Sequence, residues 1–433
     1  MTVEHLSETP FKDLGLCPEL LNSLNQAGFE YCTPIQAQSL PLLLENQDVA
    51  GQAQTGTGKT IAFLTATAQR LLTRPSPHWR KPNQPRALII APTRELAIQI
   101  HKDAELILKE TELTIGLAYG GANYDSQRKA IEQGVDILIG TPGRLIDYFK
   151  QRVFDLRAVR AMVLDEADRM FDLGFIKDIR FLFRRLPRIE KRLSMLFSAT
   201  LSLRVTELAY EHMNNPQLIK IESKTVTADK VSELVYYVAN DEKIPLLLGV
   251  LKTAAPSRTM VFTNTKRAAE EVTAYLNANQ HHAGILSGDI PQKKRQRLLE
   301  SFQQGNLPIL VATDVAARGL HIPEVSHVIN FDLPQNAEDY VHRIGRTARA
   351  GASGEAISFA CEDYAFHLPE IEEYIGHKID SAAVQAELLI TPEKPAPRKP
   401  SSNKPNKRRP RKPQQKRRPQ HRKPRPSKPT NDG

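Results

Sequence analysis

Cysteine is scarce in this sequence of 433 residues, which holds only Cys17, Cys32 and Cys361. The three are far apart, and no two of them form the C-x-x-C spacing of a zinc or redox motif. A disulfide framework and a cysteine zinc site are therefore excluded as organising features, as is usual for proteins of a reducing cytosol.

Long hydrophobic runs are also missing. No apolar run approaches the roughly 18–20 residues that a membrane-spanning helix needs, so we expect no membrane insertion. The first residues, MTVEHLSETPFKD, carry no basic segment followed by an apolar one, so we expect no secretory signal. With 40% hydrophobic and 25% charged residues, the composition is that of a folded protein large enough for more than one domain.

Positive charge is concentrated in one segment. Residues 392–433 hold 16 Lys and Arg against Glu393 and Asp432, a net +14, whereas the remaining residues sum to −4. This segment also holds 11 of the 30 prolines, a composition that predicts a disordered, extended tail. The tail is either a solubilising linker or a nucleic-acid-binding arm, and counterion release from a polyanion favours the arm.

The rest of the chain alternates short β-branched runs with longer helical patterns, and this rhythm occurs twice. Continuous apolar runs predict buried strands of a parallel sheet covered on both faces. The repeat predicts an α/β fold with two doubly wound parallel sheets in tandem, linked near residues 222–230. Residues 73–86 are expected to form a surface loop anchored by Trp79. The predicted strands are residues 86–92, 135–142, 161–166 and 193–200, then 259–264, 283–288, 308–314, 326–332 and 355–361.

A phosphate-binding motif lies in residues 53–60, AQTGTGKT, between a short apolar run and a helical pattern. It matches G-x-x-x-x-G-K-[ST] except that Ala53 replaces the first glycine. Gly56 and Gly58 let successive backbone N–H groups turn toward an anion, and the helix N-terminus adds partial positive charge. Lys59 is expected on the β- and γ-phosphates and the Thr60 hydroxyl on Mg²⁺, which predicts an ATP site.

Three carboxylates, Asp165, Glu166 and Asp168, lie within the stretch VLDEADRMFD at the end of a predicted strand. Such a cluster suits either a solvated turn or a site that holds a cation and a phosphate. Because Mg²⁺ and Lys59 would neutralise it beside a phosphate loop, the second interpretation is favoured. Asp165 is then the expected Mg²⁺ ligand, through water, and Glu166 the expected base for the attacking water.

The sequence Asp165-Glu166-Ala167-Asp168 resembles the signature of the DEAD-box RNA helicases of superfamily 2, and further motifs of that family follow in order. An amino-terminal adenine-reading motif is matched by Phe11 and by GFEYCTPIQ. Motifs that contact the RNA backbone are matched by PTRELA, Gly120-Gly121 and TPGR, and the coupling motif by Ser198-Ala199-Thr200. The second half offers VFTN, Gln292 with Arg295, ATDVAARGL and HRIGRTAR.

The resemblance implies a role for each matched residue. Catalysis would use Lys59, Asp165 and Glu166, with Arg346 and Arg349 as arginine fingers from the second half. ATP would be bound by Phe11, Thr33, Gln36, Ala53, Gln54, Thr55, Gly56, Thr57, Gly58, Lys59, Thr60, Gly319 and His321, with Mg²⁺ at Thr60 and Asp165. Coupling would involve Asp168, Ser198, Thr200 and His342, and RNA would be contacted by Thr93, Arg94, Gly121, Arg144, Arg295 and Thr313.

The resemblance also implies a domain plan with two RecA-like domains. It comprises an adenine-reading region (1–39), an ATP-binding domain (40–220), a linker and lead-in (221–244), a carboxyl-terminal helicase domain (245–391) and the basic RNA-binding tail (392–433).

One departure narrows the resemblance. Most family members carry Asp where this chain has His321, a position expected at the ATP ribose. GLHIP and the basic tail resemble the helicase subgroup of the bacterial RNA degradosome, so His321 is interpreted as a subgroup feature. That resemblance implies the RNA degradosome and its endonuclease RNase E as partners, a role in mRNA decay and a bacterial cytoplasm. Ser287 and Ala348 also depart from the common pattern, but they remove no charged catalytic group.

The expected activity is RNA-stimulated ATP hydrolysis coupled to local unwinding of short RNA duplexes, with little sequence preference. Two other classes stay open at this point: an RNA-binding scaffold with a vestigial ATPase, and an ATP-dependent DNA translocase. The presence of every charged catalytic position argues against the scaffold. The tail could also be a nuclear signal, although the degradosome resemblance argues against it.

Overall fold

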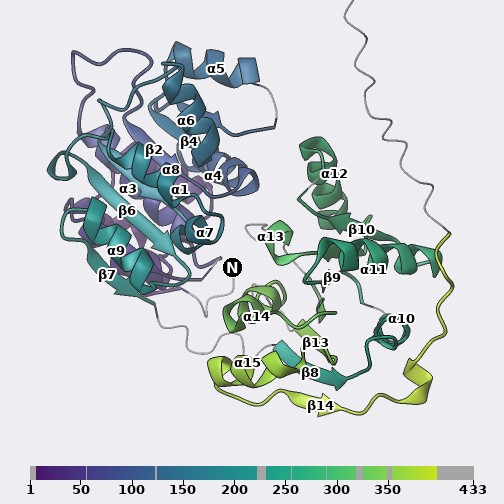
Figure 1. Ribbon diagram of the computed structural model, residues 1–433. Coiled ribbons are helices and arrows are strands. Elements are labelled where there is room, and N and C mark those ends of the chain that lie inside the picture. Colours follow the sequence, from purple (N-terminus) through teal and green to yellow (C-terminus); the bar gives the residue numbers. More distant parts are fainter. Residues whose placement is uncertain are drawn as a thin grey trace, which may run out of the picture. The chain divides into compact units, whose positions relative to one another are not determined.

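The structure is a computed structural model, and it describes residues 6–54, 56–121, 124–221, 231–254, 256–288, 290–317, 325–348 and 354–396 (Figure 1). The chain forms two lobes, each built on its own sheet. We call the described residues from 6 to 221 the first lobe and those from 231 to 396 the second lobe. The predicted linker 222–230 and the tail beyond residue 396 lie outside the described residues.

The sheet of the first lobe has seven strands in the order β3-β4-β2-β5-β6-β1-β7. Each neighbouring pair is parallel, with Gln52 opposite Ser198 and Ile90 opposite Leu164. The strands are β1 (Val49–Gln52), β2 (Ala87–Ile90), β3 (Ile115–Ala118), β4 (Ile137–Gly140), β5 (Ala161–Leu164), β6 (Leu193–Ser198) and β7 (Gln217–Lys220).

Helices cover both faces of this sheet (Figure 1). Successive strand residues point to opposite faces, so Ile89 and Val163 pack on one side while Leu88 and Leu164 pack on the other. Both faces are apolar, which is why the strands are continuously hydrophobic. The helical elements are η2 (Phe11–Leu14), α1 (Pro18–Gln26), α2 (Pro34–Leu44), α3 (Lys59–Thr73) and α4 (Arg94–Ile107), then α5 (Tyr124–Gln133), α6 (Pro142–Lys150), α7 (Ala167–Asp172), α8 (Ile176–Phe183), η3 (Ile189–Lys191) and α9 (Leu203–His212).

The second lobe repeats this plan. Its seven strands are parallel in the order β10-β11-β9-β12-β13-β8-β14. They are β8 (Val231–Tyr237), β9 (Thr259–Phe262), β10 (Ala283–Leu286), β11 (Ile309–Ala312), β12 (His327–Asn330), β13 (Gly354–Ala360) and β14 (Asp380–Ala382). The helical elements are α10 (Lys243–Ala254), α11 (Lys266–Ala278), α12 (Gln292–Gln303), α13 (Asp314–Ala317), α14 (Ala337–Ile344), η4 (Ala365–His367), α15 (Leu368–Ile375) and η5 (Ala386–Leu388).

The tandem pair of doubly wound parallel sheets confirms the predicted fold class. All nine predicted strands are present; eight are shorter than the predicted run, and β13 has the predicted length but begins one residue earlier. β8 lies in the segment predicted as linker and lead-in, yet it is a full member of the second sheet between β13 and β14. Within the part of the chain that the structure describes, no helix has the length and apolar character needed to cross a bilayer.

The loop predicted at residues 73–86 is held by a different residue than expected. Trp79 is 47% exposed. Instead, the Arg80 guanidinium donates to the carboxylate of Asp136 and the carbonyl of Val135, both at 2.8 Å. The prediction of Trp79 as the anchor is therefore wrong, because an ion pair at the end of the neighbouring strand fixes this loop instead.

Candidate functional site

Sequence-predicted site residues of the first lobe lie at one edge of its sheet. Ala53 follows β1, Asp165 follows β5, and Ser198 ends β6, so all three stand at carboxyl ends of neighbouring parallel strands. The carboxyl edge of a doubly wound sheet is where ligands of such folds bind. The sheet order thus brings together residues that are more than 140 positions apart in the sequence.

The phosphate loop connects β1 to the first turn of α3. Gly56 and Gly58 have φ of 87° and 91°, which side chains with a Cβ rarely adopt. Lys59 is 6% exposed, and its ammonium donates to the Ala53 carbonyl at 2.6 Å, so the side chain folds back across its own loop. Thr57 Oγ1 closes the turn by donating to the Gln54 carbonyl at 2.8 Å. Thr55 lies outside the described residues.

Gln36 links the amino-terminal region to this loop. Its Nε2 donates to the Gly58 carbonyl at 2.9 Å, and its Oε1 accepts from the Thr33 backbone N–H at 2.8 Å. A Cβ at Gly58 would lie 2.5 Å from Gln36 Nε2, so the glycine is required for this approach. Thr33 is the N-cap residue of α2, and Phe11 is fully buried in a hydrophobic core cluster of the first lobe.

The carboxylates of the β5–α7 turn are buried together. Asp165 is 3% exposed and Glu166 is 9% exposed. Burial raises the pKa of Asp165 to about 7, with Lys59 lowering it and the charges of Glu166 and Asp168 raising it. Glu166 has φ 49° and ψ 56°, a left-handed conformation that is unusual for a side chain of this size. Its backbone N–H donates to Asp165 Oδ1 at 2.9 Å, and its carboxylate pairs with Arg169 at 3.1 Å.

Asp168 joins this turn to the end of β6. Its Oδ2 accepts from the backbone N–H groups of Ala199 and Thr200, both at 3.1 Å. Its own N–H donates to Ser198 Oγ at 3.1 Å. The β5–α7 turn and the Ser198-Ala199-Thr200 segment are therefore one hydrogen-bonded unit, so a displacement of one would shift the other.

The candidate RNA-contact residues of the first lobe follow the neighbouring strands. Thr93 caps α4 by accepting from the Leu96 N–H. Arg94 lies so close to Gly121 (φ 91°) that a Cβ there would clash with its guanidinium. Arg144 lies over the rings of Tyr124 and Tyr148, 4.7 and 5.1 Å from their centroids. These basic groups are thus held by packing rather than left to move freely.

In the second lobe the predicted residues lie on α14 and beside α13. His342 is half-exposed on α14, and Arg346 just beyond the helix is 6% exposed. Thr313 immediately precedes α13, and its carbonyl accepts from the N–H groups of Ala316 and Ala317. Arg295 donates to the Ala316 carbonyl at 2.7 Å, so it contacts the same short helix. Gly319, His321 and Arg349 lie outside the described residues.

A buried polar network in the second lobe was not predicted. Arg343, 1% exposed, donates to both carboxylate oxygens of Asp314, at 2.6 and 2.7 Å, and to Asn264 Oδ1 at 2.8 Å. Asp332 accepts from the Asn264 N–H and pairs with buried Lys243. Arg343, Asp314 and Asn264 lie inside motifs singled out from the sequence, so the motif was visible while its internal pairing was not.

The same two-part organisation is found in known proteins. Residues 33–208 match the DEAD/DEAH box helicase family, and residues 242–351 match the helicase conserved C-terminal domain. The ATP-dependent RNA helicase RhlB of Aliivibrio fischeri is 60% identical over 390 residues, which is 90% of each chain. The chain belongs to the DEAD-box helicase family. RhlB of Vibrio vulnificus is 58% identical over 390 residues, again 90% of each chain.

Solved DEAD-box structures share the fold. S. cerevisiae Dbp5 bound to RNA and ADP BeF3 is 32% identical with a TM-score of 0.75, covering 87% of this chain and 95% of its own. Mss116 bound to ssRNA and UDP-BeF is 28% identical with a TM-score of 0.76, covering 88% and 82%. The two sheets are therefore RecA-like, and the DEAD-box chain described here is an ATP-dependent RNA helicase that uses nucleotide and binds RNA.

Proposed function

We propose that this helicase hydrolyses ATP in an RNA-stimulated manner and uses the cycle to unwind short RNA duplexes locally. The observation that carries the proposal is the Asp168 carboxylate, which accepts two backbone N–H groups from Ala199 and Thr200. It lies two residues after Glu166, the proposed base, so RNA-dependent movement of the Ser198-Ala199-Thr200 segment has a direct route to the hydrolytic turn.

The phosphate loop supplies the proposed ATP contacts. Lys59 is proposed to leave the Ala53 carbonyl for the β- and γ-phosphates, because an anion in the loop is a stronger partner than a neutral carbonyl. Phe11, Thr33 and Gln36 are proposed on the adenine side, with Ala53, Gln54, Gly56, Thr57, Gly58 and Thr60 around the phosphates. Thr55, Gly319 and His321 are proposed from the sequence alone.

The donor set of this edge fits Mg²⁺. A hydroxyl (Thr60) and a buried carboxylate (Asp165) are hard oxygen ligands, and few protein ligands suffice because phosphates and water complete the shell. Bound Mg²⁺ would supply positive charge to the phosphates. Its presence would also favour ionised Asp165, whose pKa burial raises.

The second lobe is proposed to complete the hydrolytic centre. Glu166 would take the proton of the attacking water, while Arg346 and Arg349 would meet the charge that develops on the γ-phosphate. His342, Asp168, Ser198 and Thr200 are proposed to couple this step to RNA. Because the charges come from two lobes, ATP and RNA would favour each other's binding, as linkage requires.

RNA is proposed to be held through its backbone. Thr93, Arg94, Gly121 and Arg144 in the first lobe, with Arg295 and Thr313 in the second, offer hydroxyl, backbone and guanidinium donors suited to phosphates and 2′-hydroxyls. Such contacts carry little sequence information, and those to the 2′-hydroxyl favour RNA over DNA.

The proposed setting is mRNA decay in the bacterial cytoplasm, in the RNA degradosome with RNase E docked on the second lobe. This part rests on the degradosome resemblance of the sequence, and the identity to RhlB relatives supports it.

One ATPase measurement tests these points together. Hydrolysis by the full chain is measured alone, with single-stranded RNA, with DNA of matched sequence, and with RNA plus a purified RNase E segment. We expect stimulation by RNA, little by DNA, and a further increase with the RNase E segment. Equal stimulation by DNA would favour a DNA translocase, and a rate that RNA leaves unchanged would contradict the coupling.

A further inference from the structure

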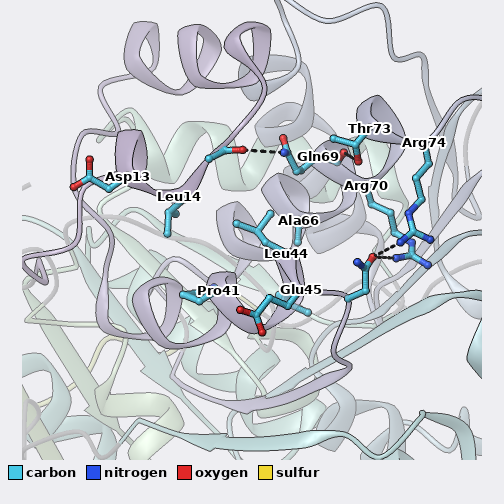
Figure 2. Close-up of a pocket in the computed structure, with 13 residues that line it drawn as sticks. Asp13, Leu14, Pro41, Leu44, Glu45, Ala66, Gln69, Arg70, Thr73 and Arg74 are labelled. Atoms are coloured by element: carbon cyan, nitrogen blue, oxygen red, sulfur yellow. Dashed lines mark hydrogen bonds between the residues drawn. The ribbon is translucent and has the colours of Figure 1, made fainter.

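A second candidate site lies in the first lobe, away from the phosphate loop. A cavity of about 620 Å³ is bounded by η2, the last turn of α2 and the last turns of α3 (Figure 2). This volume is within the range of about 300–1,000 Å³ that small-molecule sites occupy. Lys59 begins α3 and Arg70 lies 11 residues later, so the two sites are roughly 16 Å apart along one helix.

Two arginines form one end of this cavity. Arg70 and Arg74 both donate to a single neutral acceptor, Asn46 Oδ1. Among the described residues, no carboxylate lies within ion-pair distance of either guanidinium. Asp48 is the acidic group whose charge acts on the pKa of Arg70. It is itself buried, and its carboxylate already accepts from the N–H groups of Ser194 and Asn214.

No ion pair among the described residues compensates the positive charge at this end. Arg70 is 7% exposed, and its burial together with the nearby charge of Arg74 lowers its pKa to about 10, with Arg160 acting in the same direction and Asp48 against it. Paired guanidinium groups with neutral acceptors are the arrangement that a phosphate or carboxylate satisfies with charge-assisted hydrogen bonds.

The rest of the cavity has different chemistry. Leu14, Pro41, Leu44 and Ala66 give it an apolar wall. Asp13 lies on the far side of the cavity from the two arginines, and Glu45 projects from the α2 side (Figure 2). Ionised carboxylates only accept hydrogen bonds, so a ligand group that contacts them would be an amino or hydroxyl donor.

The walls are fixed in place. Gln69 on α3 donates to the Gly15 carbonyl at 3.2 Å and accepts from the Cys17 N–H at 2.8 Å, which ties the segment after η2 to α3. Arg70 also donates to the Arg160 carbonyl at 2.7 Å, and Arg86 donates to the carbonyls of Leu71 and Arg74 at the end of α3. The cavity is thus preformed by hydrogen bonds between elements.

We propose that this cavity binds a small phosphomonoester, with its phosphate on Arg70 and Arg74 and its amino or hydroxyl groups toward Asp13 and Glu45. A nucleoside monophosphate whose base carries an exocyclic amine has this pattern. The site is separate from the ATP site, and ligand binding there requires no ATP hydrolysis.

Calorimetric titration of the full chain tests this site, with the ATP site saturated by a non-hydrolysable ATP analogue. The probes are cytidine 5′-monophosphate, inorganic phosphate and cytidine. We expect the nucleotide to bind most tightly, phosphate to bind more weakly and cytidine not to bind. No heat from the nucleotide at millimolar concentration would overturn the proposal. Equal affinities for nucleotide and phosphate would reduce the site to one for free anions and overturn the proposed ligand class.

Single-residue variants test which side chains contact the phosphate end of the ligand and which contact its amino or hydroxyl end. Arg74 is exposed, so Arg74→Gln should fold normally and weaken the binding of both nucleotide and phosphate about tenfold, the loss of one charge-assisted contact. Glu45→Gln should weaken the nucleotide alone. Arg204→Gln, an exposed helical arginine of the same lobe, should change neither. Binding that Arg74→Gln leaves intact would place the ligand elsewhere and overturn the proposal.

Discussion

Glu166 combines an unusual backbone with a buried charge. Its left-handed φ of 49° is held by the hydrogen bond from its N–H to Asp165 and by the Arg169 ion pair. A non-glycine residue in this region costs on the order of 1 kcal/mol and is kept where surrounding contacts over-determine it. The conformation fixes the direction of the Glu166 side chain relative to the phosphate loop, which suits its proposed role of orienting water.

Glu166→Gln tests the proposed base. The substitution keeps the shape and the backbone but removes the proton acceptor, so turnover with saturating RNA should fall about 10²- to 10³-fold while ATP and RNA binding persist. Single-turnover hydrolysis and equilibrium binding of an ATP analogue measure the two effects. Glu207→Gln, on an exposed position of α9, is the matched control and should retain full turnover. Turnover near the unmodified rate in Glu166→Gln would exclude the base role.

Asp165 makes the protein's stability depend on pH in the absence of nucleotide. Its pKa is about 7 in the folded state, above the ordinary value of 3.8. Between pH 3.8 and about 7, the folded state therefore keeps a proton on Asp165 that the unfolded state has lost. Stability from this group is therefore fully present below pH 3.8 and decreases as pH rises toward about 7.

Asp165→Asn should remove this dependence. The neutral amide carries no buried charge, so the variant should be more stable above pH 7 by on the order of 4 kcal/mol, with little difference near pH 4. Thermal unfolding of both proteins across this pH range, without nucleotide, gives the comparison. Parallel melting curves at all pH values would show that Asp165 is ionised in the folded state throughout.

At the scale of elements, the contact between the β5–α7 turn and the end of β6 is the proposed path between hydrolysis and RNA. Ser198→Ala leaves the half-buried N–H of Asp168 without its partner and loosens one side of this contact. We expect RNA stimulation of the ATPase to fall about tenfold, while hydrolysis without RNA changes by less than about threefold.

The control for that variant lies on the same strand. Ser194→Ala removes a buried hydroxyl at the opposite end of β6, where it accepts from Arg192, and should leave RNA stimulation unchanged. Comparing the ratio of stimulated to unstimulated rates in the two variants separates coupling from general destabilisation. Equal losses in both would show that β6 matters only for stability.

Elements differ in how far the sequence reveals them. β2, β4 and β5 are buried on both faces and were predicted as continuous apolar runs. β3 and β7 are the edges of their sheet. β3 is apolar but only four residues long and buries only Gly116 and Ala118, and β7 buries only Ile219, so neither was predicted as a buried strand. β8 buries only Val231 and Val235 beside the short edge strand β14, so it was placed in the predicted linker and lead-in.

Residues of the candidate site also differ in how far the sequence reveals them. Lys59 and Asp165 were predicted because their chemistry requires a fixed spacing from glycines or a strand end. The pairing of Arg343 with Asp314 joins residues 29 positions apart, and only the sheet order of the second lobe decides that they meet. The cavity at Arg70 and Arg74 was not predicted from the sequence for a similar reason, since its walls come from three helical elements and no motif marks it.

At the scale of the whole molecule, the basic tail and the rest of the chain carry net charges of opposite sign. The structure moves the boundary between them, because Glu393 exchanges two hydrogen bonds with Asn279, at 2.9 and 3.0 Å, on the second lobe. Residue 392 is thus not the start of the tail. Residues 397–433, which lie outside the described residues, still carry 15 Lys and Arg against Asp432.

Truncation after Ala396 therefore removes the charge and keeps the Asn279 contact. Each neutralised phosphate of single-stranded RNA contributes about 0.7 to the slope of log affinity against log salt, so loss of the tail should reduce that slope by roughly 3 or more. Affinity at low salt should fall most, and RNA stimulation at saturating RNA should persist, because the proposed hydrolytic residues all lie before residue 350.

RNA binding titrated over a range of salt concentrations measures the slope. A full-length variant with every tail Lys and Arg replaced by Gln should behave like the truncation, since charge and not length is the cause. If both variants keep the slope of the unmodified chain, the tail makes no contact with RNA.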